Sequence, residues 1–401
     1  MAIAQRISKQ TTIRKQTGLG VPGSNTGQIL RRTSSIFTAA RDMYTSNEVR
    51  SDHQSSGQSY GLKSASGTIN GELSASTYQL LIEAMLEAPF AATTPYAAGT
   101  DVTPNSAGTF TDASAGYLTA GIKTGDVGRW TGFTSSAAAN NSKNFLVTSI
   151  TAGVMTGVFL NGDAVVSASA GDNVTFTVAG KKCKTPLTGH TKDYLQVEEY
   201  YSDLTDSDLF SDLVVSGLTF DMPASGNATM SATLAGLTRA LSGSQVMTSP
   251  TAETQTGIMS SINGRIYVNG TAIPITGLNI SIANGAAPTG AEIGSNSSGD
   301  VFRQQIVVTG QFTAMLRDQT VSALYDAETE ISLFAAVAES EEDAANFMAF
   351  SIPKIKITGD APDDSDAIMR TYPFSARLNV DGGAALAFDK TTIVIQDSAA
   401  V

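Results

Sequence analysis

The sequence holds one cysteine, Cys183, among its 401 residues, and only two histidines, His53 and His190. A single cysteine excludes an internal disulfide and every metal site built from several cysteines. Two histidines far apart in sequence leave little material for a histidine-based catalytic centre. No stretch approaches the roughly 18 apolar residues of a membrane-spanning helix, and the N-terminus lacks the apolar core of a signal peptide. We therefore expect a chain that is made in the cytoplasm and carries no cofactor or bound metal.

Charged residues are also scarce, at 15% of the chain, whereas hydrophobic residues make up 41%. That apolar content is enough for real cores in a chain of roughly two to three domains. Glycine, serine, threonine and alanine are plentiful, which favours a mainly β architecture with many turns over helical bundles.

The few charges are divided unevenly along the chain. Residues 1–41 hold seven basic side chains and no acid, which leaves 18 basic against 37 acidic side chains in the rest. An acidic body repels phosphate, so the balance argues against a nucleic-acid-binding protein. A basic arm, residues 1–33, could instead bind the acidic body of another copy; a solvated tail and a transit peptide are the alternatives. We expect the arm to add contacts between copies rather than core, so that its deletion leaves a folded body.

One structural pattern occurs twice in the sequence. GTINGEL at 67–73 predicts a strand before a helix at 76–87, and VVTGQF at 307–312 predicts a strand before a helix at 318–328. An alternating hairpin follows each, at 218–234 and at 352–378, and a long polar loop precedes each strand, at 51–60 and 283–300. The first helix has one apolar stripe, formed by Tyr78, Leu81, Ile82, Met85 and Leu86. The shared order predicts a duplicated unit, although chance alternation in two β-rich halves could imitate one.

Residues 92–182 differ from the rest of the chain in their sequence pattern. Short runs of alternating apolar and polar residues lie between Gly-Asp and Asn-Gly turns. They predict a small β module inserted into the first unit after its helix. The predicted organisation is an arm at 1–33, a first unit at 34–91 and 183–240, the inserted module at 92–182, a linker at 241–262 and a second unit at 263–401. The predicted fold class is mainly β: two β-sandwich units, each with one helix, and a small barrel-like module.

Several local motifs could carry chemistry, and each has a plainer interpretation. GLGVPG at 18–23 matches the dinucleotide fingerprint, but a basic arm precedes it and no βαβ unit follows. Trp130 could stack on a ligand, although the core of a small barrel suits it better. Cys183 lies among lysines that could lower its pKa, but it has no partner base.

Two groups of acids offer further alternatives. Glu198 and Glu199, near Asp203, Asp206 and Asp208, could serve a hydrolase, which would need two carboxyl groups held across a cleft. The second group comprises Asp360, Asp363, Asp364 and Asp366. These acids could bind Ca²⁺, but a solvated hairpin turn is the better interpretation.

The N-terminal third resembles the tail tube (major tail) proteins of long, non-contractile-tailed bacteriophages. The resemblance rests on RKQT at 14–17 up to Pro22, LRR at 30–32, RSD at 50–52, GTINGEL at 67–73 and Thr77-Tyr78. The segment from 125 to 133 resembles the inserted β module of the same family, and the C-terminal half resembles it by the order of its elements.

The resemblance implies a non-enzymatic virion protein whose rings close a β-barrel lumen and stack into the conduit for DNA ejection. Its partners would be its own copies, the tape-measure protein and viral DNA inside the lumen without specific binding, and the tail terminator and distal tail proteins. It would have no contact with a membrane. Arms and a long loop bridge rings in that family, which predicts ring-to-ring contacts at Arg6, Arg14, Lys15, Arg31, Arg32, His53, Asn284 and Glu292.

Many tube proteins of this family have one tube unit per chain and form hexameric rings. A chain with two units would build the same six-fold barrel from three copies. We therefore predict a trimeric, pseudo-six-fold ring, with a hexamer as the alternative. Asp221 and Asp360 are candidates for the lumen. A surface adhesin or decoration protein with a carbohydrate-binding module remains the alternative function.

Overall fold

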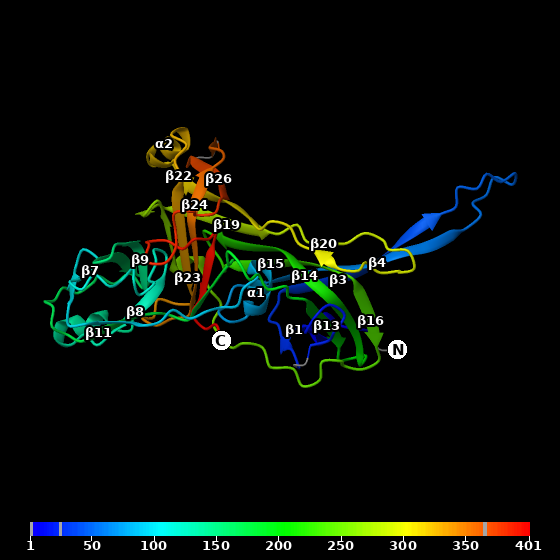
Figure 1. Ribbon diagram of the computed structural model, residues 1–401, viewed down its shortest axis with the longest axis horizontal. Coiled ribbons are helices and arrows are strands. Elements are labelled where there is room, and N and C mark those ends of the chain that lie inside the picture. Colours follow the sequence, from blue (N-terminus) through cyan, green and yellow to red (C-terminus); the bar gives the residue numbers. More distant parts are fainter. Residues whose placement is uncertain (1–2, 24–25, 364–366) are drawn as a thin grey trace.

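The computed structural model describes residues 3–23, 26–363 and 367–401. The fold is mainly β, as the sequence predicts, with a large network of antiparallel strands and a smaller curled sheet beside it (Figure 1). No helix in these ranges is long and apolar enough to span a membrane.

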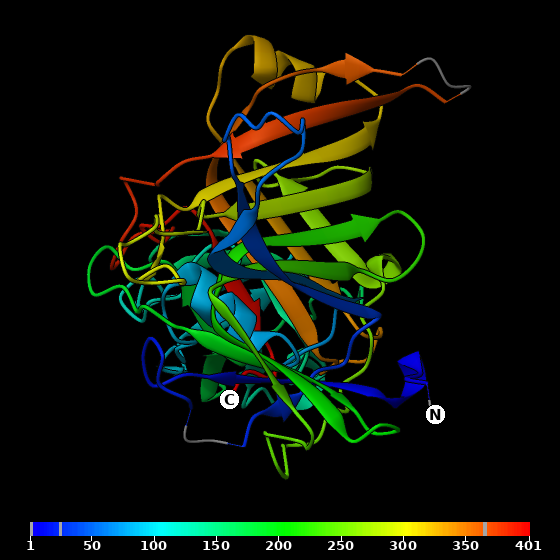
Figure 2. The ribbon, with the colours of Figure 1, turned by 90° about the vertical axis from the view of Figure 1, so that its right-hand side faces the viewer.

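A central sheet forms the middle of the molecule, and its strands lie one above another in Figure 2. Each strand pairs antiparallel with the next one named. In order they are β3 (Ser34–Thr45), β4 (Gln58–Glu72), β15 (Thr229–Gly236), β14 (Asp206–Pro223), β19 (Ile275–Ala283), β22 (Val307–Met315), β26 (Met369–Ala376) and β24 (Phe347–Ile357). The short β25 (Ala361–Pro362) continues the edge along β26.

Two of these strands bend and enter a second layer. The first half of β14 lies in a flanking sheet with β2 (Gln28–Ile29), β1 (Lys9–Lys15), β13 (Leu195–Tyr201) and β16 (Thr238–Ser242). The first half of β24 lies in another with β18 (Thr271–Ala272), β17 (Gly264–Val268), β23 (Ile331–Ala338), β27 (Val394–Asp397) and β12 (Lys181–Lys184).

The main core lies between the central sheet and these flanking sheets. Phe220 of β14 packs on Phe350 of β24 with ring centroids 4.8 Å apart, and Phe37 of β3 packs on Phe210 at 5.0 Å. Successive side chains of a strand point to opposite faces of the sheet, so alternate apolar residues all face this core. In the predicted hairpin, Phe220 lies opposite Met230, and both are buried. Helix α1 (Gln79–Leu86) packs against β14, and its predicted apolar stripe is buried.

The two α-helices are shorter than the sequence predicts. Helix α1 begins at Gln79 rather than residue 76, because Ser76 takes a left-handed φ of 63° in the turn before it. Helix α2 (Thr320–Asp326) lies within the predicted 318–328. Three short 3₁₀ turns complete the helical content of the described residues: Arg6–Ser8, Ser135–Asn140 and Ser261–Asn263.

The curled sheet lies within the predicted inserted module, at the left of Figure 1. Its strands pair in the order β5 (Tyr96–Gly99), β11 (Val174–Val178), β8 (Val127–Thr131), β9 (Phe145–Ile150), β10 (Val154–Phe159), β7 (Thr109–Asp112) and β6 (Val102–Asn105). It has its own core around the fully buried Trp130, which stacks on Phe110 at 4.9 Å. A second contact cluster, including Val127, Leu146 and Phe347, packs it against β23 and β24.

The N-terminal segment differs from the predicted independent arm. Strand β1 pairs with β13 over its whole length, and Ile13 and Leu30 are 2% and 3% exposed. The expectation that this segment adds no core is therefore wrong, because a sheet edge and apolar side chains of the body depend on it.

The two predicted polar loops lie together on one side of the molecule. Strands β3 and β4 form a long hairpin that projects from the body, at the right of Figure 1. Strand β4 begins at Gln58, so the loop is shorter than the predicted 51–60. The 283–300 loop carries β20 (Ala287–Pro288), which pairs with β21 (Val301–Phe302), and Lys63 N of β4 donates to Asn296 O at 2.9 Å.

Candidate functional site

The exposed face of the central sheet is lined by uncharged polar side chains. The face opposite the core carries residues that alternate with buried ones: Thr68, Asn70, Thr219, Ser231, Thr233, Asn279, Ser281, Thr309, Gln311, Thr313 and Thr371. Asp221 lies on this face, exposed, and accepts from Asn279 Nδ2 at 3.3 Å. Hydroxyl and amide groups give this face many weak hydrogen-bonding groups and little charge.

Asp360, the other candidate for the lumen, lies on the side of the sheet that carries α2. Its carboxylate forms an ion pair with Arg370, whose Nη1 also donates to Ser322 of α2 at 2.9 Å. The Asp360 side chain is only 11% exposed. The predicted turn that contains it also includes Asp364 and Asp366, which lie outside the described residues. Among those described, no three His, Cys, Asp or Glu side chains are grouped to hold a metal ion.

Most of the predicted ring-to-ring cations contact their own chain. Arg14 Nε donates to Gln196 at 2.8 Å, and Lys15 pairs with Asp193 at 2.7 Å. The other three arginines donate to backbone carbonyls: Arg31 to Thr256, Arg32 to Lys9 and Arg6 to Thr33.

The loop candidates for ring-to-ring contact divide into exposed and buried residues. His53 and Glu292 are exposed, on the tip of the β3–β4 hairpin and on the 283–300 loop respectively. Asn284 is fully buried, and its amide joins Val215 O to Ala286 N at 3.0 Å each. Its side chain therefore fastens the loop to β14.

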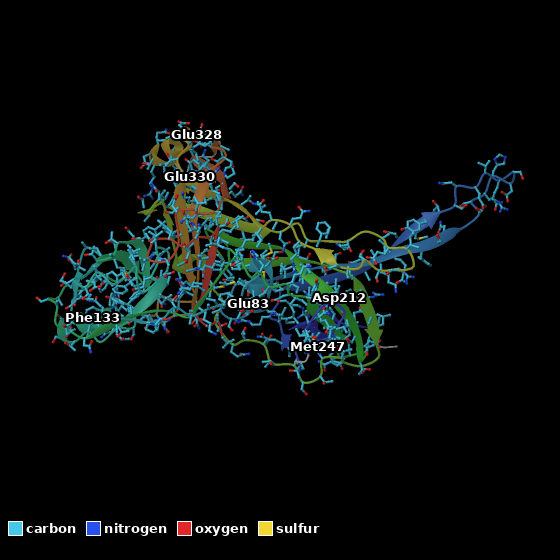
Figure 3. The ribbon with its side chains drawn as sticks, viewed as in Figure 1. Glu83, Phe133, Asp212, Met247, Glu328 and Glu330 are labelled. Carbon is cyan, nitrogen blue, oxygen red and sulfur yellow. The ribbon has the colours of Figure 1, made fainter. Side chains whose placement is uncertain are left out.

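The acids considered for hydrolysis are bound within the fold. Glu198 is fully buried and accepts from Ser207 Oγ and from the backbone amides of Val246 and Met247 at 2.5 to 2.8 Å. Glu199 pairs with Lys9 at 2.6 Å. Adjacent residues of one strand point to opposite faces, so these two carboxylates do not face each other across a cleft. Figure 3 labels Met247, in the connection after β16, and Asp212 of β14.

The remaining motifs also have structural surroundings rather than those of a binding or catalytic site. Strand β1 precedes 18–23 and the short strand β2 follows it, where a dinucleotide site needs a helix. Burial raises the pKa of the Cys183 thiol, whose Sγ donates to Ala88 O at 3.2 Å, which agrees with the interpretation that this cysteine is incidental to function. Trp130 is core, as its plainer interpretation predicts.

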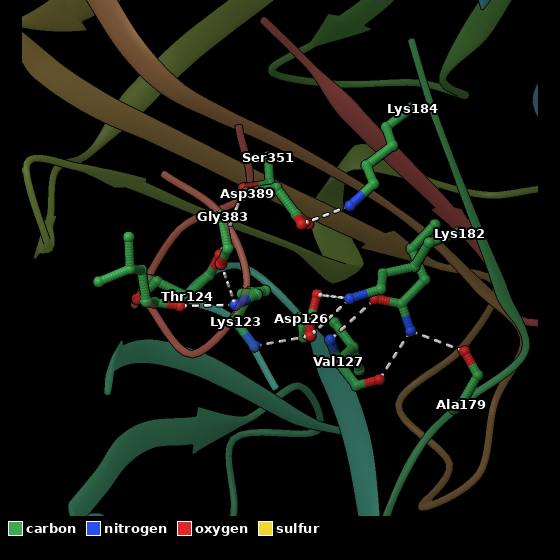
Figure 4. A network of polar contacts seen from close by, with 12 residues as sticks. Lys123, Thr124, Asp126, Val127, Ala179, Lys182, Lys184, Ser351, Gly383 and Asp389 are labelled. Atoms are coloured by element: carbon green, nitrogen blue, oxygen red, sulfur yellow. Dashed lines mark hydrogen bonds and ion pairs between the residues drawn. The ribbon is translucent and has the colours of Figure 1, made fainter. Parts of the chain in front are cut away.

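A buried polar network that the sequence does not reveal joins the curled sheet to the body (Figure 4). Lys182 Nζ of β12 lies 2.9 Å from both carboxylate oxygens of Asp126, and Lys123 Nζ donates to Gly383 O and Leu386 O at 2.7 and 2.6 Å. Burial raises the pKa of Asp126, and the Lys182 ammonium opposes that rise. These contacts join the segment before β8 to β12 and to residues 383–386 of the body.

Gln396 of β27 completes the network. Its amide donates to Val127 O and Ala179 O at 2.7 and 2.6 Å and accepts from Val127 N at 2.9 Å. One side chain thus bonds both ends of the curled sheet's connection to the body.

The geometry is therefore that of an assembly component, with a broad polar face, a projecting hairpin and no cleft of convergent titratable groups among the described residues. A family model described as phage tail tube protein matches residues 5–376. No curated protein matches the chain. The chain belongs to the phage tail tube protein family, whose members are non-enzymatic structural components that assemble with their own copies into the tail tube of the virion.

Proposed function

We propose that this protein forms the tail tube of a long, non-contractile phage tail from trimeric rings in which each chain contributes two tube units. The rings stack, and the lumen conducts DNA during ejection. The observation that carries the proposal is the repeated strand order of the central sheet.

Four strands occur in one order, and their counterparts follow in the same order. The sheet reads β3, β4, β15, β14 and then β19, β22, β26, β24. In each half the first two strands form a hairpin with a long loop, a helix follows the second strand, and the last two strands form a hairpin. Because sheet order is independent of sequence order in principle, the repeated pairing supports duplication more strongly than apolar patterning does.

The flanking sheets repeat as well. Strand β13 pairs with the first half of β14 on one side and β16 on the other, as β23 and β27 pair with β24. Strand β1 lies outside β13, as β17 lies outside β23. Each helix is followed by a glutamate with a left-handed backbone: Glu87 at φ 56° and Glu328 at φ 49°. The N-terminal segment is then the first element of the first unit rather than an arm.

The polar face of the central sheet is the surface we assign to the lumen. Side-by-side strand addition around the ring would remove the exposed edges of the sheet and close a barrel with this face inside. Hydroxyl and amide groups predominate on this face, and Lys356, which lies opposite Ser375 on it, is paired with Glu328 at 3.4 Å. Together with the net charge of −12, such a face suits a pore in which a polyanion slides without sticking. Asp221 would face this lumen, whereas the ion pair of Asp360 with Arg370 favours a structural role.

The curled sheet would project outward, because it packs against the second flanking sheet, on the side away from the polar face. It occurs once per chain, so a trimeric ring shows three projections. The exposed tip of the β3–β4 hairpin, with His53, and the 283–300 loop, with Glu292, would contact the next ring. The tape-measure protein, viral DNA, the tail terminator and the distal tail proteins would be the other partners.

Averaged electron micrographs of assembled tubes, viewed along the axis, test the proposal. Three projections per ring are expected. Six projections per ring would overturn the trimer, and particles that never form rings or tubes would overturn the assembly itself.

A further inference from the structure

The central sheet has two edges that lack a neighbour within the described chain. At one edge, β3 pairs with β4 alone. At the other, β23 leaves β24 at Ile355, after which β24 has only β26 beside it. Edges of this kind join other chains unless they are covered. We propose, building on the trimeric ring, that the contact between neighbouring chains copies the junction between the two units inside one chain.

The internal junction supplies the template for this contact. Strand β13 leaves β14 at Leu213, and β19 then pairs with β14 from Gly217 to Pro223. Strand β24 corresponds to β14, and β3 corresponds to β19. Residues 356–360 of one chain therefore pair antiparallel with residues 34–38 of the next. Thr219 lies opposite Ser281 on the polar face, and the matching pair is Thr358 opposite Ile36.

Exposure agrees with this assignment. Ile36 is 66% exposed on the edge strand β3, and Thr358, directly after the end of β24, is exposed as well. Lys9 Nζ donates to the carbonyl of Ser35 at 2.7 Å on this edge. Lys9 belongs to β1 and not to the edge strand itself, and its ammonium covers only this one carbonyl of β3.

An arginine and a glutamate approach each other at the junction between the two units. At the β24 edge of the sheet, the corresponding glutamate has no arginine or lysine from the other unit beside it among the described residues. Arg303, which is 4% exposed, lies in the segment before β22 and brings Nε within 4.0 Å of Glu87. Glu328 corresponds to Glu87 but is 82% exposed, with Lys356 as its ion-pair partner at 3.4 Å. Figure 3 shows Glu328 near α2, at the end of the sheet remote from β3. The cation that meets it is Lys63 of the next chain, which lies on β4 one residue after Leu62, the position that corresponds to Arg303.

The two edges also bear grooves of opposite charge. The groove beside β3 has a volume of about 750 Å³ and is lined by Arg6, Lys9 and Arg32 together with residues 33–36. The groove beside the end of β24 has a volume of about 380 Å³, and its charged lining is Asp326, Glu328 and Lys356, which leaves it negative. Opposite charges on the two edges favour head-to-tail contact and oppose the joining of like edges, which is the condition for a closed ring.

Cysteine cross-linking of assembled tubes tests the strand pairing. Cys183 is buried, so the background is low. The double variant Thr358→Cys with Ile36→Cys should form disulfides between chains on mild oxidation, because directly opposite residues bring their Cβ atoms within reach. Denaturing gels should show dimers and then trimers as the largest product. The variant Thr219→Cys with Ser281→Cys is the matched control, and it should form its disulfide within one chain.

The outcomes separate this inference from the trimer on which it rests. Covalent products that extend to six chains would confirm the paired edges and overturn the trimer. Tubes with three projections but no cross-link would overturn the paired edges and leave the trimer intact. Stronger cross-linking of Lys356→Cys with Ile36→Cys would overturn the register.

Charge reversal tests the ion contact separately. Glu328→Lys should slow tube formation at least tenfold at low salt without changing the folded chain, because this side chain is exposed. Adding Lys63→Glu to that variant should restore assembly. Glu342→Lys, also exposed, is the matched control. Assembly of Glu328→Lys at the normal rate would overturn this contact.

Discussion

Lys182 Nζ lies 2.9 Å from both carboxylate oxygens of Asp126, and the two side chains are 12% and 4% exposed. The pair crosses the boundary between the curled sheet and the body, since Asp126 directly precedes β8 and Lys182 belongs to β12. An ion pair held out of water is strongly sensitive to the loss of one member, because the remaining charge is left buried without compensation.

Lys182→Met should therefore lower the free energy of unfolding by about 3–5 kcal/mol. The measurement is denaturant unfolding of the unassembled chain. Lys181→Met is the matched control, since Lys181 is the neighbouring lysine of β12 and has no ion pair in the described structure; its effect should stay within about 0.5 kcal/mol. Equal effects of the two substitutions would contradict the role assigned to the pair.

Asp300 predicts a specific dependence of stability on pH. Its carboxylate accepts from Tyr194 Oη at 2.6 Å and pairs with Lys192 at 3.0 Å, where the 283–300 loop meets the start of β13. Burial alone would raise the pKa of Asp300, but hydrogen bonds from Tyr194 and Lys192 outweigh it and hold the pKa below its ordinary value of 3.8. A lowered pKa means that the stabilisation is complete above pH 3.8 and is lost as the pH falls through the lowered value.

Asp300→Asn should accordingly reduce the free energy of unfolding at neutral pH by less than about 1 kcal/mol, because the site is partly exposed. The difference from the unchanged chain should disappear in strongly acidic buffer. Denaturant unfolding curves of both proteins across a series of pH values measure this difference in the free energy of unfolding. A difference that stays constant from neutral to acidic pH would contradict the assignment.

The sequence predicts the local elements well because the apolar spacing of a strand or a helix depends only on residues close together in the chain. The hairpin that pairs Phe220 with Met230 and the stripe that includes Leu81 follow directly from periods of two and of about 3.6. The repeated order of elements is likewise visible in the sequence alone.

Long-range pairing is what the sequence could not supply. The basic character of residues 9–15 was visible, but their partner strand lies almost two hundred residues away, so Lys9 could not be matched to Glu199. Asp126 stands in a Gly-Asp pair that indicates an exposed turn, and only the packing of the curled sheet against β12 buries it. Gln58, Ser59 and Tyr60 at the start of β4 lack apolar alternation, so the sequence assigns them to the loop that precedes the strand.

The N-terminal segment should be needed for folding. Deleting residues 1–33 removes strand β1 from beside β13 and two buried apolar side chains, so we expect insoluble protein. The milder substitution Ile13→Ala should cost about 2–5 kcal/mol of the free energy of unfolding. Deleting residues 1–4, which precede the first described pairing, is the control and should leave the unfolding midpoint unchanged. A soluble, cooperatively unfolding product of the larger deletion would contradict this.

The β3–β4 hairpin should contribute to stacking rather than to folding. A two-stranded ribbon that projects from its body is marginal in water, so its exposed apolar side chains need a partner in the assembly. Met43, Tyr44 and Tyr60 are 52%, 53% and 71% exposed. Replacing all three with serine should leave the unfolding midpoint within experimental error and shorten the tubes seen by electron microscopy, because ring-to-ring contact loses apolar area while the core is untouched.

A matched control for the hairpin replaces two exposed apolar residues elsewhere, Leu378 and Val380, with serine. They are 43% and 59% exposed and lie after β26, away from the projecting hairpin. Tube lengths should be normal in this control. If the hairpin variant gives tubes of normal length, or if both variants shorten them equally, the hairpin has no special part in stacking, and the ring-to-ring contact must come from the 283–300 loop or the N-terminal cations instead.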